Sequence, residues 1–377
     1  MGEAVLSVSG HCTVVLLIFM NPPSDILSAD MQIAAARFLR WMPGSMRVHG
    51  DQLIIEGWAL GLWDMPSRVL INGLDAVDVT WRIASPDMLA KFGAVPNADA
   101  SRFFARFPLP QGQTLFPDGF VRVNVTGTFG EHRLSYRTAW YLADPALESQ
   151  VPTPARIARV IGAPDVHAFQ LGGATIVKRF EQLLLERFER PMSSFDSILD
   201  WGCGAGRLTR YLAMLAPDVI GADIDADNIQ ACREMLPKGR FEHVSLRPPC
   251  SLPADTFDLV VGVSVLTHLG QEMESEWLVE LHRLTRPGAL LLLSVQGLAQ
   301  MALYDAPTSQ KIEMHQRGFV DQGINSQLKD VVADQEYYRN ILHSPDYIMT
   351  HWSRYFDVLD IIEGMAGNQD LVILRRR

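Results

Sequence analysis

The chain of 377 residues is 48% hydrophobic and 20% charged, proportions typical of folded globular domains and not of a disordered chain. At about 150 residues per domain, its length predicts two or three folded units. The formal net charge of −10 argues against a nucleic-acid partner, because no cluster of lysines and arginines precedes residues 375–377.

Residues 1–45 are predicted to be an N-terminal extension. Their apolar run, residues 12–20, is nine residues long, whereas a membrane span needs about 20. No basic segment precedes the run and no small-residue cleavage site follows it, so we expect neither a membrane span nor a signal peptide. The run is either a buried strand or sequence upstream of a later start, such as Met31 or Met46, and both interpretations stay open.

The four cysteines of the chain are Cys12, Cys203, Cys232 and Cys250. They form no CxxC pair, so we expect no metal site and no disulfide framework. Free thiols are typical of a reducing compartment, and we therefore expect a cytoplasmic protein.

Residues 46–143 are predicted to form a β-domain. Val121, Val123 and Val125 alternate with polar residues, which places the three valines on one face of a strand. Further β-rich runs are QLIIEGWALG, SRVLING, AVDVTWRI, RFFARFPL and RLSYRTAWYL. Short strands at this spacing favour an antiparallel sandwich. The tryptophans of this domain are expected in its core, and a platform on which sugars stack is the alternative.

Two features connect this domain to the rest of the chain. Residues 144–165 contain four prolines and are predicted to be a linker or a docking strap, because proline stiffens the chain and removes a hydrogen-bond donor. A helix is predicted downstream of them. Its buried face is expected to carry Ile176, Phe180, Leu183, Leu184 and Phe188.

From residue 197 onward, strand and helix patterns alternate. The predicted strands are SILDW, VIGADI, FDLVVGVSV and ALLLLSV, with helices from about residue 207, over residues 228–236 and over SEWLVELHRLT. This alternation predicts an α/β fold with a Rossmann-like, mostly parallel sheet and helices on both faces. The last two strands, YFDVLDIIEG and QDLVILRRR, are expected to form a terminal antiparallel hairpin.

Three glycines, Gly202, Gly204 and Gly206, follow the strand SILDW and precede a helix. Inside a regular element each glycine costs about 0.5–1 kcal/mol relative to alanine, so the cluster indicates that a ligand lies against the backbone. Ligands of open α/β sheets bind where strand carboxyl ends meet helix amino ends. Asp223, 19 residues after Gly204, ends the next strand, where a carboxylate can accept both hydroxyls of a ribose. The pattern predicts a nucleoside site.

The loop has the spacing D-x-G-x-G-x-G, beginning at Asp200, which differs from the G-x-G-x-x-G of dinucleotide folds. It resembles motif I of the class I S-adenosylmethionine-dependent methyltransferases. The resemblance continues through residues 252–269 and 281–295, which match that family's fourth and fifth strands, and covers roughly residues 165–377. It implies that residues 166–377 are a methyltransferase domain that binds S-adenosyl-L-methionine.

The resemblance also assigns residues to the cofactor. They are Asp200, Gly202, Cys203, Gly204, Gly206, Asp223, Ile224 and Ser264. Asp200 is expected near the amino group of the cofactor, Asp223 at the ribose hydroxyls and Ile224 against the adenine. Cys203 is expected to be a small filler, since no basic partner for a thiolate is visible. The acid with which this family often binds the adenine amino group is missing, because residues 247–250 read RPPC.

Ser264 and His268 are expected beside the methyl group, and His268 is the candidate catalytic residue. It is either a general base or a structural side chain that donates to a backbone carbonyl, and both interpretations stay open. Residues 296–350 are expected to cover the acceptor, with Tyr338 and His343 on a helix. The candidate acceptor-site residues are Tyr304, His315, Tyr337, Tyr338, His343 and Tyr347.

These patterns predict an enzyme that methylates a small-molecule or saccharide acceptor. The stretch IIEGWALG…VLINGLDAV loosely resembles small β-sandwich modules beside bacterial glycan-modifying enzymes, which favours a saccharide or glycan. The alternative is a non-catalytic binding or scaffold protein that retains the cofactor and recognises carbohydrate through its β-domain. A nicotinamide-dependent oxidoreductase is disfavoured by the glycine spacing and by the terminal hairpin.

Overall fold

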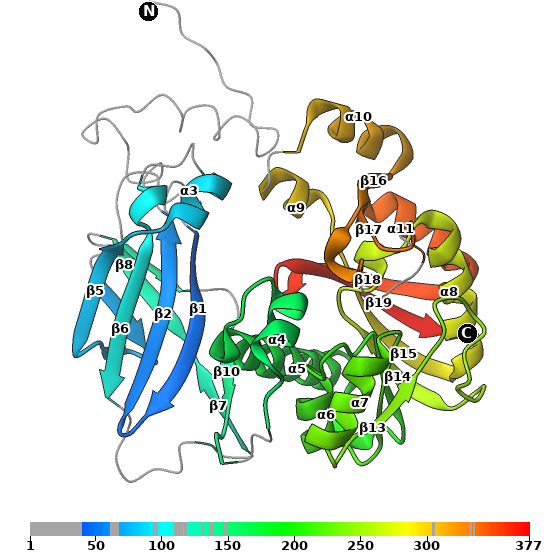
Figure 1. Cartoon of the computed structure of the whole chain (residues 1–377), viewed down its shortest axis with the longest axis horizontal. Helices are drawn as coiled ribbons and strands as arrows, with labels where there is room; N and C mark the ends of the chain where they lie inside the picture. The colour runs from blue at the N-terminus through cyan, green and yellow to red at the C-terminus, as the bar shows by residue number, and fades with distance from the viewer. Residues whose placement is uncertain are drawn as a thin grey trace, which may run out of the picture. The chain divides into compact units, whose positions relative to one another are not determined.

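The computed structural model describes residues 40–60, 68–92, 97–108, 116, 119–129, 132–135, 139–146, 150–303, 306–329, 331, 334 and 336–377. The chain divides into two compact units, Met1–Pro117 with Arg122–Trp140 and Asp118–Val121 with Tyr141–Arg377. Figure 1 labels the elements of both units in chain order. The apolar run at residues 12–20 lies outside the described residues.

The first unit contains two antiparallel sheets of four strands each. One has the order β1-β2-β6-β5, with β1 at Arg40–His49, β2 at Gln52–Leu60, β6 at Arg102–Pro108 and β5 at Asp78–Ile83. The other has the order β4-β3-β8-β9, with β4 at Leu74–Asp75, β3 at Arg68–Ile71, β8 at Val125–Phe129 and β9 at His132–Ser135. The helix α3 (Pro86–Phe92) lies between β5 and β6 in the chain.

Alternation of side chains is clear in β6, where Phe103, Ala105 and Phe107 are at most 1% exposed and the intervening Arg106 is exposed. In β2, Leu53, Ile54 and Ile55 are buried in succession. The predicted runs QLIIEGWALG, SRVLING, AVDVTWRI and RFFARFPL correspond to β2, β3, β5 and β6, whereas RLSYRTAWYL is divided between β9 and a second strand, Trp140–Ala143. A further two-stranded sheet pairs β7 (Phe120–Val123) with β10 (Trp140–Ala143).

The second unit is built on a seven-stranded sheet with the order β13-β12-β11-β14-β15-β19-β18. Its strands are β11 (Ile198–Trp201), β12 (Val219–Asp223), β13 (Arg240–His243), β14 (Phe257–Gly262), β15 (Thr285–Val295), β18 (Phe356–Ala366) and β19 (Gln369–Arg376). The first five are parallel, and β19 is antiparallel to both β15 and β18. The predicted parallel sheet and its closing hairpin are both confirmed.

Helices cover both faces of this sheet (Figure 1). They are α4 (Pro154–Ile161), α5 (Val166–Phe188), α6 (Thr209–Leu215), α7 (Ala226–Met235) and α8 (Gln271–Leu284). Adjacent residues of β14 belong to different cores: Val260 packs in the cluster that contains Trp277 of α8, and Val261 packs in the cluster that contains Phe180 of α5. The continuous apolar runs of the central strands follow from this two-sided burial.

The order of strands places a switch point at β11, whose two neighbours, β12 and β14, lead away in opposite directions. Connections from neighbouring strands leave toward opposite faces there, which opens a crevice at the strand carboxyl ends. The glycine loop follows β11 directly, so it lies at this crevice.

Residues 144–165 and 296–350 differ from the expectations. The predicted linker contains the helix α4. After β15 come α9 (Leu298–Leu303), α10 (Thr308–Arg317), β16 (Phe319–Ile324), β17 (Arg339–His343) and α11 (Pro345–His351). The predicted helix over Tyr338 and His343 is wrong, because His343 pairs with Phe319 in an antiparallel ladder. Tyr304 lies outside the described residues.

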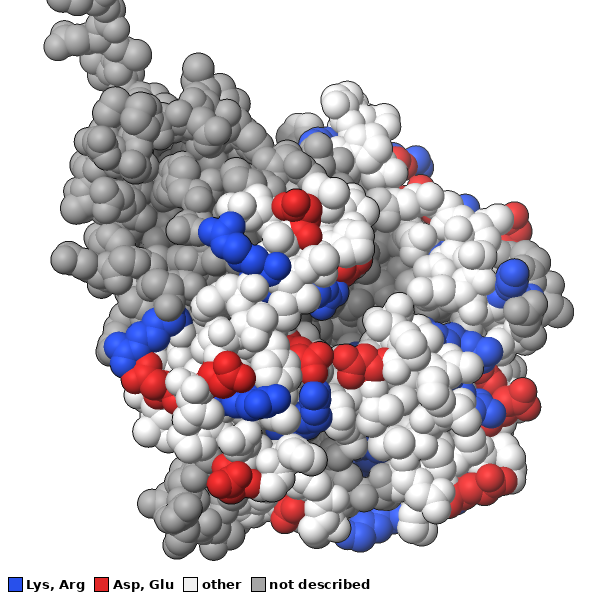
Figure 2. Space-filling view, turned by 60° about the vertical axis from the view of Figure 1, so that its left-hand side comes forward, with Lys and Arg blue, Asp and Glu red and all other residues white. Residues whose placement is uncertain are grey.

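The surface carries charges of both signs. On the face shown in Figure 2, the acidic and basic side chains of the described residues are interspersed among neutral ones. A nucleic acid is bound by a continuous basic surface, which the described residues of this face do not present. Of the helices in the described part of the chain, none combines the length and the apolar character that crossing a bilayer requires.

Candidate functional site

The glycine loop after β11 adopts a backbone conformation that side chains resist. Gly202, Gly204 and Gly206 have φ of +73°, +52° and +73°. A Cβ on Gly202 would lie 2.3 Å from Cγ2 of Val265, and a Cβ on Gly206 would lie 2.5 Å from Cδ1 of Leu236. The loop is therefore packed closely against the segment after β14 and against the end of α7, with Gly202 and Gly204 half-buried and Gly206 buried.

Asp223 meets this loop from the end of β12. Its Oδ2 accepts a hydrogen bond from the Gly204 amide at 2.7 Å, and its Oδ1 accepts one from the Asp225 amide at 2.8 Å. Burial raises the pKa of Asp223. Each carboxylate oxygen has a second lone pair, so both can still accept a hydroxyl. Ile224 follows, half-buried against the core, and its carbonyl lies 3.2 Å from Nε2 of His243.

Asp200, within β11, is 2% exposed and accepts a hydrogen bond from Oγ1 of Thr209 at 2.5 Å. Burial raises its pKa to about 6, although the hydrogen bond from Thr209 and the charge of Arg207 act in the opposite direction. Arg207 is a charged residue at this site that the sequence reasoning missed. The available signal was an arginine placed directly after the third glycine.

Ser264 follows β14 in a strained conformation, with φ +63°. Three hydrogen bonds hold it there: the Ser264 amide donates to Oγ of Ser294 at 2.8 Å, that hydroxyl donates to Oε1 of Gln369 at 2.6 Å, and Nε2 of Gln369 donates to Oγ of Ser264 at 2.8 Å. Gln369 was also missed, and no local pattern marks it, because it starts the last strand far along the chain.

His268 lies in a short helical turn after β14, with its Nδ1 2.7 Å from the carbonyl oxygen of Arg339. Since a carbonyl only accepts, Nδ1 carries the hydrogen and donates it. The ring stacks on Tyr338 with centroids 4.0 Å apart. Burial lowers the pKa of His268 to about 4, so the imidazole is neutral and its Nε2 keeps a lone pair.

The cysteines of the loop region are not poised for nucleophilic chemistry. Cys203 and Cys232 are 5% and 0% exposed and pack in one small cluster with Phe241. Burial raises the pKa of Cys203, and burial raises that of Cys232 to about 12. Since the thiolate is the reactive form, both thiols are inert at neutral pH.

Residues of the segment after β15 lie in two different regions of the structure. Tyr338 stacks on His268. Burial raises the pKa of Tyr338 and the charge of Asp223 raises it further, so Tyr338 lies close enough to Asp223 for the two groups to interact. Tyr347 and His343 instead lie in the core, where their side chains contact the buried carboxylate of Glu274 at 3.0 Å and 2.5 Å. The expected acceptor-site residues therefore divide into a group near His268 and a structural group.

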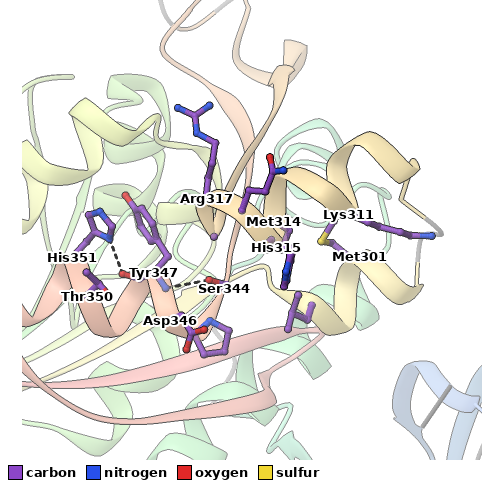
Figure 3. A pocket seen from close by; sticks show the side chains of 14 residues that line it. Met301, Lys311, Met314, His315, Arg317, Ser344, Asp346, Tyr347, Thr350 and His351 are labelled. Carbon is purple, nitrogen blue, oxygen red and sulfur yellow. Dashed lines mark hydrogen bonds between the residues drawn. The ribbon is translucent and has the colours of Figure 1, made fainter. Parts of the chain in front are cut away.

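A cavity of about 710 Å³ lies beside α10 and α11. Figure 3 shows its lining, in which His351 and Ser344 form hydrogen bonds with the backbone of Tyr347. Met301 and Met314 also line it and belong to one small apolar cluster. Apolar and basic side chains share the walls, and His315 is among them. His315, an expected acceptor-site residue, therefore lies in the wall of this cavity.

Comparison with known proteins finds similarity to methyltransferases in the central part of the chain. A family model described as "Methyltransferase domain" matches residues 198–288, the stretch from β11 to the start of β15. The chain is 30% identical over 118 residues to the ubiquinone biosynthesis O-methyltransferase of Bradyrhizobium sp. (strain ORS 278), covering 29% of this chain and 45% of that protein.

Two further relatives match over similar lengths. The chain is 32% identical over 116 residues to a probable S-adenosylmethionine-dependent methyltransferase of Mycolicibacterium smegmatis, covering 31% of this chain and 44% of that one. It is 32% identical over 114 residues to the ribosomal protein L11 methyltransferase of Cupriavidus metallidurans, covering 30% and 36%. The chain thus spans less than half the length of each of these relatives.

Proposed function

We propose that this chain is a class I, S-adenosylmethionine-dependent methyltransferase, as the match of residues 198–288 to a methyltransferase-domain model supports, and that it transfers a methyl group to a hydroxyl of a small-molecule or saccharide acceptor. The observation that carries the proposal is the carboxylate of Asp223 against the Gly204 amide at the switch point of the sheet, inside the stretch that the family model matches.

The described residues fit this cofactor. The glycine loop, half-buried at Gly202 and Gly204, offers backbone without side chains to a flat nucleoside, and the carboxylate of Asp223 has lone pairs for the two ribose hydroxyls. Asp200 offers a negative charge to the ammonium group of the methionine portion. When bound, S-adenosylmethionine supplies a methyl group whose bond to sulfur breaks with both electrons remaining on sulfur.

His268 supports a hydroxyl as the attacking group. Its Nδ1 hydrogen is engaged by the Arg339 carbonyl, so Nε2 is the free acceptor. A hydroxyl bound beside His268 would pass its proton to Nε2, and the imidazolium would later return it to solvent. Orientation of the two reactants supplies most of the acceleration, and such a base adds a factor of about 10²–10⁴.

Side chains of the first unit support a saccharide as the acceptor. Phe103 and Trp81 pack together with ring centroids 5.2 Å apart, while Phe104 points to the other side of β6. The guanidinium of Arg106 lies over the ring of Phe104 at 5.1 Å. An aromatic ring beside a basic group on a sheet face is suited to stacking and hydrogen-bonding a sugar.

The first experiment is a calorimetric titration of the full chain with S-adenosylhomocysteine, with NAD as the comparison ligand. We expect a micromolar dissociation constant for S-adenosylhomocysteine and no heat from NAD. Absence of S-adenosylhomocysteine binding would overturn the proposed function.

Cofactor affinity is expected to depend on the ionisation of Asp200. Its pKa of about 6 means that the carboxyl is mostly neutral at pH 5 and mostly charged at pH 7. Because the cofactor ammonium favours the charged form, S-adenosylhomocysteine should bind roughly tenfold more weakly at pH 5 than at pH 7. Calorimetry across this range, repeated on Asp200→Asn, measures the effect. The variant should bind weakly at both pH values; an unchanged pH dependence would assign the proton to another group.

Replacing His268 by glutamine tests the base. Glutamine can still donate to the Arg339 carbonyl but cannot take a proton, so methyl transfer should fall about 10²–10⁴-fold while S-adenosylhomocysteine affinity stays the same. Because the pKa is about 4, loss of wild-type activity through His268 begins only as pH falls toward 4. Turnover is measured with tritiated S-adenosylmethionine on a panel of hydroxylated small molecules and methyl glycosides. Equal turnover by wild type and variant would remove His268 from catalysis.

A further inference from the structure

The cavity beside α10 and α11 is separate from the candidate cofactor site. Every described residue that lines it lies between Leu298 and His351, so it shares no residue with the glycine loop. The strand β17 also separates it from His268. The carbonyl of Arg339, at the start of β17, contacts His268, whereas Ser344, just past the end of β17, lines the cavity. At the rise of a β-strand, these two positions are about 16 Å apart.

Backbone contacts hold the two helices that flank the cavity. At the end of α10, the Gly318 amide donates to the Met314 carbonyl at 2.9 Å, and the Gly318 carbonyl accepts from the Ser344 amide at 2.7 Å. A Cβ on Gly318, where φ is +69°, would lie 2.8 Å from Cβ of Tyr347 on α11. The helices therefore touch at this glycine. Because these contacts fix the walls in advance, a ligand would bind with little reorganisation of the protein.

Methionines and a leucine form the apolar part of the lining. Met301 and Met314 are 5% and 4% exposed and pack with Val320 and Leu342 in one cluster. Leu298, at the start of α9, lines the same cavity and is 53% exposed. Methionine side chains are unbranched and flexible, so they adapt to an alkyl chain. An alkyl chain placed against these residues would remove apolar surface of both partners from water, which is favourable.

The ionisable part of the lining is predominantly basic. Lys311, His315 and Arg317 come from α10, and His351 comes from α11. Among the described residues that line the cavity, only Asp346 carries a carboxylate. Figure 3 shows His315 between Lys311 on one side and Arg317 on the other. The whole chain has a formal net charge of −10, so this wall has the opposite sign to the protein around it and attracts an anion.

The side chain of Arg317 is placed to pair with such an anion. It is 72% exposed, and its Nη1 lies 3.6 Å from Oε1 of Glu313, which is longer than a hydrogen bond. Glu313 therefore leaves the N–H groups of the guanidinium available to a ligand. The planar fork of these groups matches two oxygens of a carboxylate or a phosphate.

We propose that this cavity binds an organic anion with an apolar body, that is, a carboxylate or phosphate head on an alkyl chain. Arg317 pairs with the head, the neighbouring basic side chains add to the attraction, and Met301 and Leu298 contact the chain. The volume of about 710 Å³ suits such a ligand, because small-molecule pockets measure about 300–1,000 Å³. This binding is independent of the proposed methyl transfer, since it needs neither the cofactor nor His268.

Four ligands with the same chain length separate the head from the body. The full chain is titrated by calorimetry with decanoate, decyl phosphate, decanol and decylammonium. We expect micromolar dissociation constants for the two anions, at least tenfold weaker binding of decanol and no saturable binding of decylammonium. Tighter binding of decanoate would identify a fatty-acid carboxylate as the preferred head, and tighter binding of decyl phosphate would identify a phosphorylated lipid. Failure of both anions to bind, or equal affinity for the anions and decanol, would overturn the proposal.

Arg317→Gln tests the contact with the head. It should weaken both anions at least tenfold and leave decanol within twofold. Arg286→Gln is the matched control: Arg286 pairs with the exposed carboxylate of Asp196 at 3.1 Å and lies at the opposite end of β15 from α9. Its affinity for all four ligands should equal that of wild type. Equal losses in the two arginine variants would mean that the anions respond to net charge alone, and the proposed pairing would be wrong.

Leu298→Asp tests the location of the bound chain. Since Leu298 is 53% exposed, its replacement leaves the buried clusters intact. The new carboxylate should repel the head and weaken both anions at least tenfold. Leu298→Asn has the same shape without the charge and should have a smaller effect. If Leu298→Asp binds both anions as tightly as wild type, they bind elsewhere on the protein, and this cavity is not their site.

Discussion

Replacing Asp223 by alanine is expected to weaken S-adenosylhomocysteine binding at least tenfold, which corresponds to about 1.4 kcal/mol. Two effects combine in this variant. The ribose hydroxyls lose their acceptor, and the amides of Gly204 and Asp225 lose the carboxylate that holds them. Calorimetric titration of wild type and variant measures the difference.

Asp227→Ala is the matched control for this experiment. Asp227 is an exposed carboxylate in the first turn of α7, four residues further along the chain, so its removal changes the local charge equally. We expect its affinity to stay within about twofold of wild type, because the exposed carboxylate acts only through screened, long-range interactions. If both variants lose affinity alike, Asp223 acts through general electrostatics and does not bind the ribose.

Replacing Glu274 by alanine is expected to lower the free energy of unfolding of the second unit by about 3–5 kcal/mol. Glu274 is 1% exposed, and its carboxylate accepts hydrogen bonds from the Tyr347 hydroxyl at 3.0 Å and the Trp352 indole at 2.9 Å. His343 Nε2 lies 2.5 Å from its other oxygen. The variant leaves these buried donors without an acceptor. Urea unfolding followed by tryptophan fluorescence measures the loss.

Glu276→Ala on the same helix provides the comparison. Glu276 pairs with Arg247 at 3.1 Å, but the pair lies at the surface, with side chains 56% and 35% exposed for Arg247 and Glu276. Removing such a pair costs about 0–1 kcal/mol. A loss of 1 kcal/mol or less in Glu274→Ala would show that its neighbours find other partners, and the polar network would then be incidental to stability.

The Glu274 network also bears on the site. It joins α8 to β17 and α11, and β17 begins at Arg339, whose carbonyl fixes the tautomer of His268. The stability of the segment from β17 to α11 and the orientation of His268 therefore depend on the same set of contacts. Glu274→Ala is expected to disturb His268 only indirectly, so S-adenosylhomocysteine affinity is the readout that separates damage to the cofactor site from loss of stability.

Local patterns of the sequence determined the central elements of the second unit. Apolar residues in SILDW and VIGADI predicted two strands, and the longer apolar runs in FDLVVGVSV and ALLLLSV predicted buried strands. The glycines after the first run and Asp223 after the second predicted the meeting of loop and carboxylate, and Gly204 and Asp223 do share a hydrogen bond. Strand, turn and helix signals are local, so a single sequence contains them.

The tertiary structure alone decided which distant residues meet. His343 belongs to a strand because its hydrogen-bond partners begin at Phe319, and this pairing overrides the local pattern that predicted a helix. Gln369 contacts Ser264 across 105 residues of chain, and Glu274 contacts His343 across 69. Arg207 packs against Gly173 of α5, which lies 34 residues earlier in the chain. Such contacts arise from packing between elements, and the order of residues within each element does not encode them locally.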